Sequence, residues 1–156
     1  MSEIREDIVT AYVTRLGTIA TGSGYRYTVD TVERGYRDPS DVGSSERPYI
    51  GVYAGSRESY KDTSGGLVEV EMQIILSCYL TASAATQAAV IAALSGFTSD
   101  VRKALYTSPQ NLSVPGLIFV RVVSRMGTEG LVEAAKTKNA AMQIETIAKF
   151  QESSTA

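Results

Sequence analysis

The sequence predicts an α+β fold: a single domain with a mixed, mainly antiparallel sheet of about five strands and two amphipathic helices packed on it. Residues 67–80 alternate between apolar and mainly polar side chains, which is the period of a β-strand with one buried face. Residues 4–20 and 81–107 instead repeat apolar residues every three or four positions, as helices do when they cover one apolar surface. The expected order is helix, three strands, helix, two strands.

The first helix is expected to run from about Ile4 to about Ala20. Ser2 is suited to cap its N-terminus, and Gly22-Ser23-Gly24 supplies residues that commonly end a helix. Its apolar residues are spaced by four, four, four and three positions: Ile4, Ile8, Tyr12, Leu16 and Ile19.

The second helix, residues 81–107, has Ser83 as a candidate cap and Pro109 just beyond its end. Gly96 interrupts its pattern at a cost of about 1 kcal/mol relative to alanine, so we expect a bend or a close contact there. Its apolar positions also follow a helical spacing: Val90, Leu94, Phe97, Val101 and Leu105.

Five segments have the alternation of strands, and polar stretches with glycine separate them. The turn at residues 61–66 should join the second and third strands in one extended antiparallel hairpin. Connections of this length commonly have a role, so we expect at least two of three to contact a partner: 36–47, 59–66 and 127–139. The expected strands are 25–35, 48–59, 67–80, 114–126 and 140–151, followed by a frayed tail at 152–156.

The two sheet faces differ in composition. The expected core-facing side chains are all apolar: Val68, Val70, Met72, Ile74, Leu76, Ile118, Val120 and Val122. If both helices cover that face, several large apolar residues of the opposite face are left exposed, and such patches usually mark a partner surface. If one helix covers each face, the same residues are ordinary core. The interface candidates are Ile75, Tyr79, Leu117, Phe119, Arg121, Val123 and Arg125.

The composition excludes several function classes. A net charge of -2 with scattered lysine and arginine argues against wrapping nucleic acid. The chain has no histidine, which removes the commonest general base and metal ligand. Cys78 is the single cysteine, so no disulfide framework is expected and a reducing compartment is favoured. No segment approaches the roughly 20 apolar residues of a membrane span, and the acidic N-terminus does not resemble a signal peptide.

Candidate chemical motifs are weak. Glu69 and Glu71 share one strand face and could hold a cation or act as acid and base, but a solvated face paired with Arg121 or Arg125 is favoured. Cys78 lies on the apolar face and is expected to be an inert buried thiol. We therefore expect no catalytic, cofactor-binding or metal-binding residues. The remaining candidate is a serine–lysine arrangement that we interpret as a polar hairpin end: Ser56, Ser59 and Lys61.

Five segments together resemble phage tail terminator proteins, which cap a completed tail tube and join it to the head. They are REDIVTAYVTRLGTI in the first helix, TVDTVERGY and RPYIGVY around the loop, the long strand LVEVEMQIILSCYL, and the helix end DVRKALYTSPQNLSVPG. The resemblance covers most of residues 1–156 and lies in the order of the segments, their lengths and their pattern of apolar and polar residues. It carries over no functional residue individually, because the function of the family lies in surfaces.

The resemblance implies a structural virion protein, not an enzyme, assembled in the host cytoplasm and located in the tail or neck. It implies a homo-oligomeric ring, usually a hexamer, in contact with the tail tube protein, a neck or head-completion protein and, in a contractile tail, the sheath protein. DNA would pass through the lumen without specific binding. The alternatives are another neck or tail-completion protein, a tube subunit, or a small soluble ligand-binding or enzymatic domain.

The long third strand has an explanation in such a ring. At about 3.3 Å per residue, residues 67–80 would reach on the order of 45 Å, while an ordinary strand has about five or six residues. We expect the strand to extend into a neighbour or to line a shared channel, where pairing would protect its edge.

Overall fold

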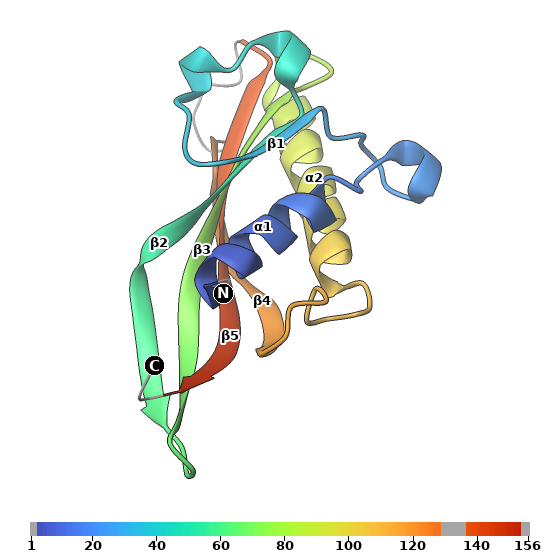
Figure 1. Cartoon of the computed structure of the whole chain (residues 1–156). Coiled ribbons are helices and arrows are strands. Elements are labelled where there is room, and N and C mark those ends of the chain that lie inside the picture. The colour runs from blue at the N-terminus through green and yellow to red at the C-terminus, as the bar shows by residue number, and fades with distance from the viewer. Residues whose placement is uncertain (1–2, 129–136, 154–156) are drawn as a thin grey trace.

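A computed structural model of the chain describes residues 3–128 and 137–153. It confirms the α+β class and the expected order of elements (Figure 1). The sheet order is β1-β2-β3-β5-β4, with β1 parallel to β2 and every other pair antiparallel. The elements are α1 (Ile4–Leu16), β1 (Thr31–Arg34), β2 (Tyr49–Asp62), β3 (Leu67–Thr81), α2 (Gln87–Tyr106), β4 (Leu117–Gly127) and β5 (Asn139–Ser153), with short 3₁₀ turns at Thr21–Ser23, Pro39–Asp41 and Ser44–Glu46.

Both helices pack on one face of the sheet, as Figure 1 shows, and they share one hydrophobic core with it. The arrangement with one helix on each face is therefore wrong. Alternate residues of the two central strands point into this core, which confirms the periodicity of β3. The core-facing residues of these strands include Val70, Met72, Ile74 and Leu76 on β3, and Met142, Ile144, Ala148 and Phe150 on β5.

The first helix is shorter than expected, because it ends at Leu16 and Gly17 forms its C-cap. Glu3 caps its N-terminus by accepting a hydrogen bond from the Glu6 N–H. Near the other end, the Arg15 guanidinium donates to the backbone carbonyls of Ala104 and Thr107 at 3.1 and 2.5 Å. This contact ties α1 to the C-terminus of α2, where a cation is favourable.

The second helix begins at Gln87, with Thr86 as its cap, so the expected start near Ser83 is wrong. Residues 81–85 do not belong to the helix, because Thr81 ends β3 and the chain must turn before α2. The close contact expected at Gly96 is confirmed. A Cβ at this position would lie 3.0 Å from the Cε2 of Tyr27.

Alanine at Gly96 tests this contact. Helix propensity alone would stabilise Gly96→Ala by about 1 kcal/mol, but crowding in a packed site usually costs about 1–3 kcal/mol. We expect the free energy of unfolding, measured in urea, to decrease by about 1 kcal/mol in Gly96→Ala. The exposed neighbour Ser95 provides the control, since Ser95→Ala should be neutral or slightly stabilising. A Gly96→Ala variant more stable than the wild type would contradict the contact.

The first strand covers only Thr31–Arg34, while residues 25–30 form an extended segment outside the sheet. The cause is Asp100, a buried carboxylate on α2 that accepts the N–H groups of Arg26 and Tyr27 at 3.0 and 2.9 Å. These hydrogen bonds hold Arg26 and Tyr27 on the helix, and the chain reaches β2 only at Asp30, whose N–H donates to the Pro48 carbonyl at 2.9 Å.

The β2–β3 hairpin is longer than expected and projects beyond the helices (Figure 1). All of β3 pairs with β5, and most of it also pairs with β2, so β3 is an inner strand of the sheet. Strand β5 continues to Ser153, and Glu152 pairs with Val68, so 152–153 is not frayed. Residues 154–156 of the expected tail and 129–136 of the expected connection lie outside the described residues.

Two bulges change which side chains of β4 face the core. Leu117 pairs with Phe150 and Phe119 with Lys149, so the additional residue Ile118 bulges out and is exposed. The second bulge, at Val123, lies between the pairs formed by Val122 and Ser124. Because a bulge shifts the alternation by one residue, three sequence assignments on β4 are wrong. Leu117 is in the core, Ile118 is not, and Arg125 lies on the helix side in register with Ile144.

Candidate functional site

The sheet face opposite the helices, called the open face below, carries no helix among the described residues. Partly buried apolar side chains lie across its middle, and Met126 at its border is 80% exposed. The apolar residues are Tyr53, Ile75, Phe119 and Ile147. Three acidic residues (Glu69, Glu71, Glu145) face three basic residues (Lys61, Lys149, Arg121), so the charges of these described residues balance.

Half of these charged side chains have a polar partner within the described part of the chain. The Lys149 ammonium lies 3.2 Å from the Glu69 carboxylate and 5.7 Å from the centre of the Phe119 ring. Glu145 accepts hydrogen bonds from the side chains of Gln73 and Ser124. Among the described residues, the carboxylate of Glu71, the guanidinium of Arg121 and the ammonium of Lys61 have no such partner.

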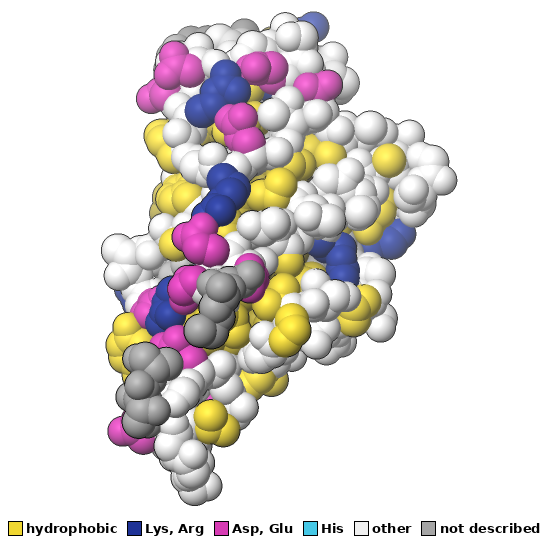
Figure 2. All heavy atoms as spheres, viewed as in Figure 1, with side chains coloured by type: hydrophobic (Ala, Val, Ile, Leu, Met, Phe, Trp, Pro, Cys, Tyr) yellow, Lys and Arg dark blue, Asp and Glu magenta, His cyan; other side chains and the backbone are white. Residues whose placement is uncertain are grey.

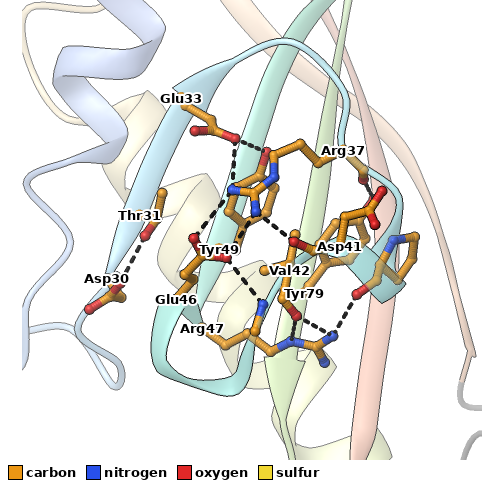
Figure 3. Close-up of polar contacts among 12 residues, drawn as sticks. Asp30, Thr31, Glu33, Arg37, Asp41, Val42, Glu46, Arg47, Tyr49 and Tyr79 are labelled. Carbon is orange, nitrogen blue, oxygen red and sulfur yellow. Dashed lines mark hydrogen bonds and ion pairs between the residues drawn. The ribbon is translucent and has the colours of Figure 1, made fainter.

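The loop between β1 and β2 covers one end of the open face, as Figure 3 shows. Val42 of this loop packs on Tyr49 and Tyr79, whose rings stack in parallel at 5.3 Å. The Tyr79 hydroxyl donates to the Arg37 carbonyl at 2.6 Å, and burial raises the pKa of this hydroxyl. Tyr79 is therefore buried under the loop and is not the exposed interface residue that the sequence suggested.

Two arginines hold this loop in place (Figure 3). Arg37 pairs with Glu33 and Glu46 at 3.3 and 3.0 Å. Arg47 donates to the backbone carbonyls of Val42, Pro39 and Leu80 and to the Asn139 side chain. This network closes one end of the open face, so its accessible part lies toward the projecting hairpin.

A groove of about 450 Å³ runs beside the unpaired edge of β2, where the N-terminus of α1 approaches the end of β1. Its apolar lining is formed by Val9, Val52, Ala54 and Met72, and its rim is charged. Figure 2 shows acidic and basic side chains interleaved along this side of the molecule. The rim residues are Glu3, Arg5, Glu6, Arg34 and Glu58.

The interface candidates occupy three different environments. Ile75, Phe119 and Arg121 lie on the open face, and Val123 is 48% exposed in the second β4 bulge. The alternation of β2 and β5 could have indicated Tyr53 and Ile147, which sequence reasoning missed, whereas only the bulge at Val123 brings Met126 to this face. The remaining candidates are buried or on the other face: Tyr79, Leu117 and Arg125.

The chemical candidates form no reactive arrangement. Ser59, Lys61, Glu69 and Glu71 line a hollow of about 220 Å³ together with Lys149, which neutralises Glu69. Burial raises the pKa of the Cys78 thiol, so it is protonated and inert at neutral pH. Within residues 3–128 and 137–153, no group of three acidic or cysteine side chains is placed to hold a metal ion. No helix in this part of the chain is long and apolar enough to cross a membrane.

Comparison with known proteins supports the fold. No protein-family model matches the chain, and no curated protein sequence matches it. A solved chain from the virion of a native gene transfer agent particle is similar in structure, with a TM-score of 0.62 at 15% sequence identity. The match covers 97% of this chain and 100% of that chain, so the two share one fold over their whole length.

Proposed function

We propose that this chain is a structural virion protein that acts as a tail terminator: it forms a ring on the last layer of the tail tube and provides the surface to which the head or neck attaches. The observation that carries this proposal is the open face. Both helices cover the opposite side, and the loop network closes only one end of the open face. A sheet that its own helices cover on one side only can present the other side to a channel shared by several copies.

In the proposed ring the open face lines the lumen and the helices lie outside. The balanced charges suit this position, because a strongly basic lumen would bind the phosphates of passing DNA and an acidic one would repel them. We propose six subunits, as the resemblance to tail terminators implies. The proposed partners are the tail tube protein on one rim and a neck or head-completion protein on the other, with the sheath protein added in a contractile tail.

Two further observations support a role in a virion. The fold is shared over its full length with a chain from a gene transfer agent virion, a phage-like particle. Lys149 neutralises Glu69 and Cys78 is buried, which favours a non-catalytic protein without cofactor. Within the virion, we propose a position in the tail or neck.

A deletion of the gene tests the proposal. One rim of a terminator ring must bind the tube, and the opposite rim must not bind a further tube layer. Phage lacking this chain should therefore produce filled heads and unjoined tails of irregular or excess length, which electron microscopy would show. Complementation with the wild-type chain is the control. Virions of normal length with heads attached would exclude a terminator, whereas complete absence of tubes would indicate a tube subunit.

A further inference from the structure

The sheet has two free edges on opposite sides. On one side, β1 pairs with β2 only from Tyr49 to Val52, so β2 beyond this point has no strand neighbour on its outer side among the described residues. On the other side, β4 is the last of the described strands of the sheet. Exposed strand edges are prone to associate with other chains, and a protein keeps them free when a partner covers them.

The two free edges lie at the same level of the sheet. Two rows of paired residues that cross the sheet from β2 to β4 mark this level. In the first row, Tyr60 pairs with Val70, Val70 with Phe150, and Phe150 with Leu117. In the second row, Tyr53 pairs with Ile75, Ile75 with Glu145, and Glu145 with Ser124. Between these two rows, each edge strand contains two more residues than the inner strand beside it. Eight residues of each edge strand (53–60 and 117–124) stand beside six of each inner strand (70–75 and 145–150).

Strand direction also permits the two edges to meet in a ring. From β2 to β4 the four strands alternate in direction, so β4 runs opposite to β2. If copies stand in the same orientation around an axis, β4 of one copy lies antiparallel to β2 of the next. This contact between β4 and β2 joins two different surfaces of the chain. Contacts of this kind form a closed ring when the rotation between neighbouring copies divides a full turn evenly.

The exposed apolar side chains at the two edges match in position. Val123 lies at the level of Tyr53 and Ala54, where the groove beside β2 has its apolar lining. Tyr60 is 65% exposed on β2, and the bulged Ile118 is 42% exposed near the same level of β4. A neighbouring copy would therefore offer Val123 to the groove and Ile118 to Tyr60.

The unpaired charges are complementary across the same contact. Arg121 on β4 and Glu71 on β3 have no partner within the described part of their own chain. Glu71 is in register with Ser59 of β2, so Arg121 of the next copy would reach it across the β2 bulge, which contains the small residues Gly55 and Ser56 and the exposed Arg57. The Val122 N–H is already donated to the Tyr106 hydroxyl, so side chains rather than an unbroken backbone ladder carry this contact.

We propose that the free edge of β2 and the groove beside it bind β4 of a second copy of this chain, with Val123 in the groove, Ile118 against Tyr60 and Arg121 paired with Glu71. This subunit contact rests on the proposed function, since it is the lateral contact of the ring. It also explains why the two edges and their exposed apolar residues are left uncovered in a single chain.

Cross-linking of engineered cysteines tests the contact, because the native Cys78 thiol is buried and unreactive. The double variant Tyr60→Cys with Ile118→Cys, treated with a short bis-maleimide, should give a ladder of covalent oligomers that ends at the ring. Each single variant alone should stay monomeric on a denaturing gel, and a mixture of the two should stop at dimers. Cross-linked dimers of either single variant alone, or no ladder with the double variant, would overturn the proposal.

A charge exchange provides a second test. Arg121→Glu and Glu71→Arg should each weaken association, by roughly 3- to 10-fold in the dissociation constant measured by sedimentation, and the double exchange should restore it. Arg26→Glu makes the same charge change on the helix side of the molecule and should leave association unchanged. Failure of the double exchange to recover association would remove the Arg121–Glu71 pair from the contact.

The outcomes separate this contact from the proposed function. Rings seen by native mass spectrometry without a cross-linked ladder would overturn the edge assignment and leave the terminator proposal standing. A ladder together with a normal deletion phenotype would support the contact and exclude the terminator. A monomer both in the purified chain and in purified virions would exclude both.

Discussion

Asp100→Ala is expected to lower the free energy of unfolding by about 3 kcal/mol, because two backbone N–H groups lose a charged acceptor. Both oxygens of the Asp100 carboxylate are used, one by Arg26 and one by Tyr27. The segment that they hold also packs through the edge-to-face contact of Tyr27 with Phe97, at 5.8 Å between ring centres. Its release would expose both this contact and the end of the core.

Thermal unfolding followed by circular dichroism would show this loss as a decrease of roughly 6–12 °C in Tm for a chain of this size. Asp100→Asn retains one acceptor and should fall between the wild type and the alanine variant. The control is Asp30→Ala, since Asp30 is exposed and its carboxylate accepts, within the described part of the chain, only from the Thr31 hydroxyl. If Asp100→Ala lowers the Tm no more than Asp30→Ala does, residues 25–30 are held by packing alone.

Arg5→Met should lower the free energy of unfolding by about 2 kcal/mol at neutral pH. This loss lies between those expected for breaking an exposed ion pair and a buried one. The Arg5 guanidinium makes two hydrogen bonds to Glu58 and two to Glu152, and it lies 5.1 Å from the centre of the Phe150 ring. It thereby joins α1 to the base of the projecting hairpin and the end of β5. The variant leaves two partly buried carboxylates beside each other without a cation.

The pH dependence of this effect has a definite sign. The hydrogen bonds from Arg5 lower the pKa of Glu58 below its ordinary value of 4.5. A lowered folded-state pKa contributes stability that is fully present above about pH 4.5 and is lost as the pH falls through the folded-state value. The stability difference between wild type and Arg5→Met should therefore be largest near neutral pH and shrink as Glu58 becomes protonated.

Urea unfolding at about pH 7 and about pH 3 measures this difference. Arg34→Met is the matched control, because Arg34 pairs with Glu6 at an exposed site and should cost at most a few tenths of a kcal/mol at either pH. A difference between wild type and Arg5→Met that is the same at both pH values would show that Arg5 acts through its contact with Phe150 rather than through the carboxylates.

Local periodicity was sufficient where a strand or helix is regular. The alternation of β3 identified its core-facing residues, from Val70 to Leu76, because this pattern depends on neighbours within a few residues along the chain. The interruption at Gly96 indicated a bend or a close contact, but only the tertiary structure identified Tyr27 as the residue in contact. The side chains of the open face follow from the same alternation, so Ile75, Phe119 and Arg121 were placed from sequence.

Features that depend on distant partners were not predictable. Nothing in the order of residues 114–126 distinguishes Leu117 in the core from Ile118 in a bulge, because the bulges are defined by the pairing with β5. Tyr79 is buried only because a loop more than 30 residues earlier in the chain folds over it. Asp100 likewise has the sequence pattern of an ordinary polar helix residue.

The sequence by itself determined the α+β class, the order of the elements, the apolar faces of the helices and central strands, and the weakness of every catalytic motif. The tertiary structure decided that both helices lie on one face, that the free edges belong to β2 and β4 rather than β3, and that Val123 and Ile118 are exposed. The physical reason is the range of the interactions. Periodicity reports which face of an element is apolar, whereas strand pairing and loop packing decide which of those faces remain uncovered.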